Sequence, residues 1–381
     1  MAETYPREVL KEFVLQRLRL TPNTLGKNKN DVPSVVRVVG GLQYGGHLIE
    51  LFNRFENFKQ EWFDYWYKNY TLIEGHVLRG ALRIVTADEY PYFFKATRSV
   101  ARRRASYQKC PLSLNANHLI AFNFLKEHGP ITPSEFKNLL GVKYPQLKTI
   151  AKRLLSELCN YGEVARMGRK NLRPLYHTVG KLPFKLSMVE MGEKEAEKWL
   201  FLNCLRAYGP FTVKDVAHWV GWNLTETKET LRALLDGKKI MSVKVEGERD
   251  THFICVEDLD SLNSLQDNLP ENSFVRILFN DDALLLGYYR KLKDYFGYYW
   301  KYPQLSEGIV WRAAILHGRQ LAGEAIVDMY TKSQHFKIRK LVLRRRFATS
   351  EIVSKIEDEL KRHAAFQSKS LEMVAPEFVQ D

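Results

Sequence analysis

The residues whose types and spacing suggest a chemical role in this sequence are mainly arginines and lysines. Two stretches, residues 95–109 and 332–346, contain six and seven of these cations and no acidic residue. Unopposed cations at this density suit contacts with the phosphates of a nucleic acid, although a solvated linker or strand face has the same composition. The candidate DNA contacts in these stretches are Arg102, Arg103, Arg104, Arg344 and Arg345.

The net charge of the whole chain also favours a nucleic-acid partner. Its 381 residues contain 58 lysines and arginines against 44 acidic residues, a net charge of +14. Such a chain favours a polyanionic partner, most simply nucleic acid, and a generally basic set of host proteins is the alternative explanation. No apolar run approaches the roughly 18 residues of a membrane helix, and the charged N-terminus is unlike a signal peptide. We therefore expect a cytoplasmic, nucleoid-associated monomer with no membrane partner.

The signatures of the common cofactor-dependent enzymes are absent from the sequence. It has no Walker loop, no GxGxxG, no H-E-x-x-H and no G-x-S-x-G. The four cysteines lie 49, 45 and 51 residues apart, so that no C-x-x-C pair exists to hold zinc. We expect neither a metal nor a cofactor.

An internal repeat indicates the elements that position the cations. Residues 129–132 read Gly-Pro-Ile-Thr, and eighty residues later 209–212 read Gly-Pro-Phe-Thr. Each string follows an amphipathic helix and precedes a short helix, a longer helix and an alternating hairpin. The predicted longer helices and hairpins are 145–158 with 164–179, and 225–235 with 240–256. This is the order of a winged helix, whose third helix can enter a major groove of DNA; a protein-contact role is the alternative.

The two copies differ in charge. The longer helix and hairpin of the first copy carry a clear excess of cations, whereas the second copy has acids and bases in similar numbers. We therefore expect the first copy to bind phosphates and the second to act as a spacer or packing partner. The candidate DNA contacts in the first copy are Lys148, Lys152, Arg169 and Lys170.

The rest of the chain completes a mainly helical α+β fold with small β-sheets. We expect tandem winged-helix domains followed by an antiparallel, β-barrel-like domain built from several short strands. The expected divisions are a degenerate winged helix at 1–112, winged helices at 113–185 and 190–257, the barrel-like domain at 270–346, and a C-terminal helix and tail at 347–381. The last ~18 residues look frayed.

Several short strings, in this order, resemble the winged-helix DNA glycosylases of the AlkZ/YcaQ-like family. They are Val38–Gln43 (VVGGLQ), Leu78–Val85 (LRGALRIV), Leu205–Pro210 (LRAYGP), Trp219–Gly221 (WVG) and Leu286–Arg290 (LGYYR). The resemblance implies three winged helices and a β-barrel around damaged double-stranded DNA. It also implies excision of bulky alkylated purines, including the unhooking of interstrand crosslinks. A hairpin of that family probes DNA, which makes Arg79 and Arg83 candidate contacts along one strand face, with a structural salt bridge as the alternative.

The family's catalytic motif is Gln, an apolar residue, then Gln or Asp. Gln43 matches the first position, Tyr44 fills the middle and adds a candidate DNA contact, and Gly45 stands at the third. N-glycosidic cleavage develops positive charge on the sugar, so that a polar or anionic group and a placed water are needed. Glycine supplies neither, and the role could pass to His47 or Glu50 if one helix continued from Gln43. Gly45 and Gly46 argue against that continuity.

Other interpretations of these residues remain open. Gln43 could be a capping or turn residue, and His47 and Glu50 an ordinary solvated face. The function is then either that of a monofunctional DNA glycosylase or that of a non-catalytic winged-helix protein that senses damage or regulates.

Overall fold

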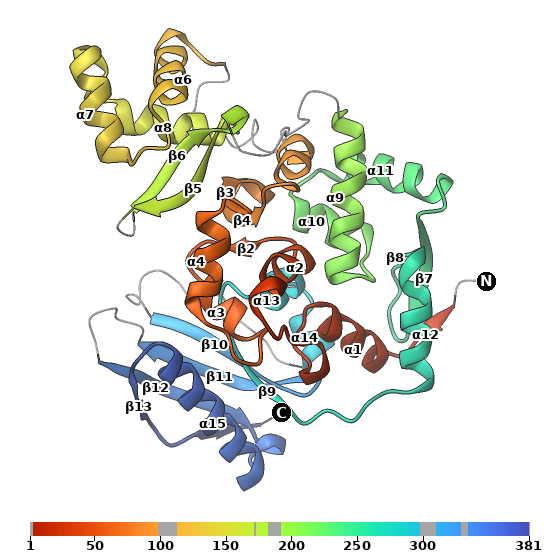
Figure 1. Ribbon diagram of the computed structural model, residues 1–381. Helices are drawn as coiled ribbons and strands as arrows, with labels where there is room; N and C mark the ends of the chain where they lie inside the picture. Colours follow the sequence, from red (N-terminus) through yellow and green to blue (C-terminus); the bar gives the residue numbers. More distant parts are fainter. Residues whose placement is uncertain are drawn as a thin grey trace.

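The computed structural model describes residues 3–97, 113–170, 173–181, 192–297, 310–328 and 334–380. It contains many helices and three small sheets, and the predicted α+β fold class is confirmed (Figure 1). The candidate contacts Arg102, Arg103 and Arg104 lie outside the described residues. None of the described helices is both long and apolar enough to cross a membrane.

The N-terminal part of the chain is joined to the first winged-helix hairpin in one sheet. Its elements are β1 (Thr4–Tyr5), α1 (Arg7–Arg17), α2 (Val32–Val38), β2 (Leu42–Gln43), α3 (His47–Phe52), α4 (Gln60–Lys68), β3 (Leu72–His76) and β4 (Leu82–Thr86). The sheet has the strand order β2-β4-β3-β5-β6, where β5 (Val164–Lys170) and β6 (Arg173–Thr178) form the hairpin. The junction is the pairing of Glu74 with Arg166.

Both copies of the repeat fold as three helices followed by a hairpin. The helices are α6 (Ala116–His128), α7 (Pro133–Lys143) and α8 (Ala151–Asn160) in the first copy, and α9 (Glu193–Tyr208), α10 (Val213–Val220) and α11 (Leu224–Asp236) in the second, followed by β7 (Ile240–Val245) and β8 (His252–Cys255). In each copy the threonine of the repeated string caps the second helix, Thr132 with Glu135 and Thr212 with Asp215.

One predicted helix of the first copy is interrupted. The expected continuous helix over 145–158 is a 3₁₀ turn at Pro145–Leu147 followed, three residues later, by α8. Pro145 begins the turn, where its missing N–H costs nothing, and α8 starts only at Ala151. The structure therefore corrects this prediction.

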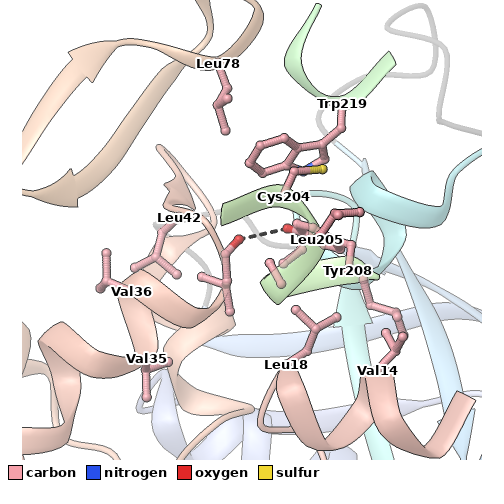
Figure 2. Packing of buried hydrophobic residues seen from close by; sticks show 14 of the residues in the cluster. Val14, Leu18, Val35, Val36, Leu42, Leu78, Cys204, Leu205, Tyr208 and Trp219 are labelled. Carbon is pink, nitrogen blue, oxygen red and sulfur yellow. Dashed lines mark hydrogen bonds between the residues drawn. The ribbon is translucent and has the colours of Figure 1, made fainter. Parts of the chain in front are cut away.

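The second copy packs into the N-terminal part, whereas the first copy has a core of its own. Trp219, Leu205 and Tyr208 lie in the same buried cluster as Val36 and Leu42 (Figure 2). A separate cluster of the first copy contains only residues between 121 and 176 among those described. The second copy is thus a packing partner, as its balanced charge indicated.

The C-terminal part is a curled six-stranded sheet crossed by one long helix. Its elements are β9 (Val275–Phe279), α13 (Ala283–Tyr288), α14 (Leu292–Phe296), β10 (Val310–His317), β11 (Gln320–Asp328), β12 (His335–Arg344), α15 (Ser350–Phe366), β13 (Ser370–Met373) and β14 (Glu377–Val379); α12 (Leu259–Asp267) precedes them. Strands β9 to β12 are antiparallel, as expected.

The expectation of a frayed tail is wrong, and the antiparallel sheet expected over 270–346 is extended beyond that range by parallel strands. Both β13 and β14 pair with β12 in parallel. The cause is α15, which returns the chain to the start of β12, because strands joined by a helical crossover run in the same direction. A second parallel pairing joins β1 to β7.

Candidate active site

The loop that carries Gln43 is a sharp turn between β2 and α3. Gln43 pairs with Arg83 of β4, and the Tyr44 N–H donates to the carbonyl of Leu82 at 3.2 Å. Gly45 then adopts φ +110°, a conformation that L side chains rarely take, and α3 begins at His47. No single helix runs from Gln43 to Glu50, so the face predicted to unite them does not exist.

The Gln43 side chain is half-buried. No described residue makes a hydrogen bond with its amide group. The next position is open: a Cβ on Gly45 would meet no atom within 4 Å. Gln43 therefore carries an amide, with a carbonyl acceptor and two N–H donors, that no described residue engages, on a loop whose Gly45 faces open space.

Buried groups hold the turn that precedes Gln43. Gly41 has φ +88°, and a Cβ there would lie 2.8 Å from Cγ1 of Val85. The Arg83 guanidinium, 2 % exposed, donates from Nη1 to the Gly41 carbonyl at 2.9 Å. The Tyr208 hydroxyl donates to the Val39 carbonyl at 2.8 Å (Figure 2). Arg83 thus supports the loop from inside the protein, and its side chain has little exposed surface with which to contact DNA.

Arg79 and Arg83 do not share a strand face as predicted. Arg79 lies in the turn Leu78–Gly80 between β3 and β4, with φ +54°. It is half-buried near α10, where its charge, after burial, helps to lower the pKa of His218.

His47 is a neutral packing residue in this structure. Its ring stacks on Tyr44, with centroids 5.9 Å apart, and lies tilted against Phe63 at 4.8 Å. Burial, and then the charge of Arg169, lower its pKa to about 3. Because the ring is uncharged near neutral pH, it supplies no ionic group to the loop.

Glu50 faces away from the loop into a buried ionic cluster. Its Oε1 accepts a hydrogen bond from the Ala283 N–H at 3.1 Å and lies 3.8 Å from Nη2 of Arg54. Arg54 is fully buried and binds both oxygens of Asp282, at 2.7 and 3.0 Å. Burial, only partly offset by Arg54, raises the pKa of Glu50 to about 8. The cluster joins α3 to the start of α13.

A second buried carboxylate, that of Glu74, which the sequence analysis did not identify, binds arginines of the β5–β6 hairpin close to the loop. Glu74 is completely buried; it accepts a hydrogen bond from the Tyr67 hydroxyl at 2.6 Å. Arg166 and Arg169 face it at 3.5 and 3.4 Å. Both guanidinium carbons also lie 5.6 Å from the Tyr44 ring centroid, within cation–π range. Tyr44 and Arg169, both DNA-contact candidates, therefore contact each other.

A bulge explains how Arg166 and Arg169 reach the same carboxylate. Residues three apart on a regular strand point to opposite faces. The register of β5 against β6 shifts between these two arginines, and Gly168 there has φ +67°. The extra residue of a bulge re-aims one side chain. An acidic residue inside an alternating strand, as in Ile73-Glu74-Gly75, was the available sequence signal for a buried charge.

The remaining cationic candidates divide into exposed and buried side chains. Lys148, Lys152 and Arg345 are exposed, and Lys170 is exposed while paired with Glu135 at 2.7 Å. Arg344 is buried and donates to the Leu321 carbonyl at 3.1 Å. Its role here is to support the sheet. Within the described ranges, no group of three or more His, Cys, Asp or Glu residues is arranged to hold a metal ion.

Comparisons with known proteins agree with this architecture. The family model described as DNA glycosylase AlkZ-like matches residues 36–366. The chain is also similar in structure to the Streptomyces sahachiroi DNA glycosylase AlkZ, with a TM-score of 0.72 and 16% identity over 98% of this chain and 100% of that one. At this identity the likeness shows the fold alone. A search of curated proteins finds no match.

Proposed function

The chain belongs to the AlkZ-like family of DNA glycosylases, and from that premise we propose that it hydrolyses the N-glycosidic bond of bulky alkylated purines in double-stranded DNA. The proposed substrates include purines joined in interstrand crosslinks. We propose that it acts as a monomer, in the nucleoid where such DNA lies.

The observation that carries the proposal is the placement of Gln43. Gln43 ends β2 on a turn held by Arg83 and Tyr208, two positions before Gly45, where a Cβ would meet open space. Cleavage leaves positive charge at the sugar C1′, which the carbonyl dipole of the Gln43 amide can stabilise, and the same amide can orient the attacking water. In this proposal His47 and Glu50 support the loop, since one is packed between rings and the other is turned toward Arg54.

Exposed cations supply the DNA affinity in this proposal. Lys152 lies on α8, the third helix of the first winged helix, and Lys148 lies just before it. Lys170 lies on the hairpin of the same winged helix. The hairpin also brings Arg169 to Tyr44 beside the Gln43 loop. Phosphates bound by these groups would hold the duplex next to the loop. Arg345 would extend the contact to the C-terminal sheet.

The test is release of N7-alkylated guanine from a duplex, measured in single turnover as alkali-labile strand breaks. Gln43→Ala should lower the rate by about 10² or more, as expected for loss of one preorganised polar group. Affinity for the same duplex should stay nearly unchanged, because a neutral side chain adds little to a phosphate-dominated complex. Gln60→Ala, at an exposed position of α4, is the matched control.

Two results would overturn the proposal. One is full activity of the Gln43 variant. The other is wild-type protein that binds alkylated and crosslinked duplexes tightly and releases no base, which would establish a non-catalytic sensor or regulator.

A further inference from the structure

We infer that Asp281 supplies the second polar group of the active site, in place of the residue that Gly45 lacks. The inference rests on the proposed glycosylase function. It draws on the corner between β9 and α13, far along the chain from Gln43, where nothing in the sequence marked a catalytic residue.

Asp281 lies directly against the Gln43 loop. A Cβ on Gly46 would stand 3.0 Å from the Asp281 Cβ and 3.5 Å from its Oδ2. A larger residue at position 46 would press on the Asp281 Cβ, so that glycine suits this close approach of the two segments. Gly46 is three positions after Gln43, so that their Cα atoms lie at most about 11 Å apart. The Asp281 carboxylate thus lies beside the short loop that carries Gln43.

Buried contacts fix the corner that carries Asp281. Asp282 is bound through both oxygens by Arg54, and the Ala283 N–H donates to Glu50 at 3.1 Å. The Asn53 amide donates to the Ile277 carbonyl at 2.8 Å. Since all three partners lie on or just after α3, the helix that follows the Gln43 loop, the loop and the corner form one unit. Moving one partner of a buried ion pair away would leave an uncompensated buried charge, so the pair holds the corner in place.

The exposure of the nearby acids distinguishes Asp281 from them. Glu50 and Asp282 are 3 % and 2 % exposed and are engaged with Arg54, so neither can reach a substrate. Asp281 also has an interaction of its own within the protein, but its side chain is partly exposed on the same corner. It therefore keeps access to solvent and to a bound nucleotide while its backbone is held by its neighbours.

The chemistry suits a carboxylate at this place. As the bond between C1′ and N9 breaks, its electron pair moves to the purine and neutralises the positive charge of the N7-alkylated base. The oxygen of a water forms the new bond to C1′. Its proton passes to the Asp281 carboxylate and then to solvent, while the negative charge stabilises the cationic sugar before the water bonds.

The test compares Asp281→Asn with Asp236→Asn, which removes the same charge from an exposed position on α11. Both are assayed with a duplex containing one N7-methylguanine. Asp281→Asn should lower the single-turnover rate about 10²-fold or more without weakening binding. The rate of the wild type should fall at acid pH as the carboxylate is protonated, and the variant should lose that dependence. A structural role would not produce this change in the pH profile.

If Asp281→Asn is less stable than the wild type, Asp281→Glu tests whether the negative charge itself is needed for activity. A glutamate keeps the charge and should retain a measurable part of the activity. Equal loss in both variants, or a rate for Asp281→Asn equal to that of Asp236→Asn, overturns the inference. In both cases an active wild type leaves the proposed function standing, whereas an inactive wild type removes the proposed function itself.

Discussion

Replacing Glu50 with glutamine tests whether this buried carboxyl supports the loop or takes part in catalysis. Its pKa is about 8 in the folded protein, against an ordinary value of 4.5, because burial outweighs the attraction of Arg54. Between these two pH values the folded chain holds a proton that the unfolded chain has released. Stability therefore falls as pH rises through this window, by about 1.4 kcal/mol per pH unit for one whole proton.

Glutamine removes this dependence while its amide oxygen can still accept the Ala283 N–H. Relative to the wild type, the Glu50→Gln variant should gain about 2–3 kcal/mol of unfolding free energy between pH 6 and pH 8. The assay is denaturant unfolding of both proteins over that range, with Glu61→Gln, at an exposed position of α4, as the control for lost charge. Groups that titrate alike in both proteins cancel in the difference.

The same variant should release alkylated guanine within about threefold of the wild-type rate, because Glu50 contacts Arg54 and the Ala283 backbone rather than the open space at Gly45. A loss of 10²-fold with unchanged stability would refute the reasoning and restore Glu50 as the catalytic carboxylate. A stability difference that did not change with pH would show that the carboxyl is ionised in the fold throughout.

Two further predictions concern binding and the loop. With about five to eight phosphate contacts, a plot of log K for binding to undamaged duplex against log salt concentration should have a slope of roughly −4.5 to −7. Joint replacement of Arg102, Arg103 and Arg104 by alanine should make this slope shallower for every DNA sequence. An unchanged slope would place these arginines outside the DNA-binding surface. Gly41→Ala should lower stability by about 1–3 kcal/mol because of its positive φ, and by more because the new Cβ meets Val85. Gly45→Ala should lower stability only through its positive φ, since its Cβ meets no atom within 4 Å. Equal melting temperatures for the two variants would contradict the close packing at Gly41.

The repeat was predictable because its signals are local. A Gly-Pro turn followed by a capping threonine ends one helix and begins the next, and both occur in each copy. Short-range chemistry of this kind needs no knowledge of the rest of the fold.

The parallel pairings had no such signal. Whether the chain after α15 returns to β12, or β1 reaches β7, depends on the direction in which distant segments run. The junction of β3 with β5 is of the same kind, and it is this junction that brings Arg166 to Glu74. Local periodicity predicts that a strand exists, but the choice of its neighbour is made by packing that spans the chain.

The sequence predicted Gln43 as the first residue of the candidate site, but it did not predict which residues surround it. Gln43 and its glycines were visible in the sequence, and the break before α3 follows from Gly45 and Gly46. The environments of His47 and Glu50 were not visible, because burial beside Phe63 and Arg54 is a property of the assembled fold. A polar residue in a helical segment has the same sequence pattern whether it faces water or a buried ion.

The arrangement of buried charge around the loop bears on why the site is built this way. Glu74 with Arg166 and Arg169 joins the first hairpin to the loop region, and Arg54 with Asp282 joins the segment after α3 to the start of α13. Buried ions cost desolvation energy that an apolar core would avoid, but separating such a pair leaves an uncompensated charge, so the paired groups resist displacement. Glycosidic cleavage needs that property, because a misplacement of about 1 Å lowers the rate of reaction steeply. Two ionic clusters that join the loop to separate parts of the chain therefore leave the space beside Gly45 open while holding the groups around it still.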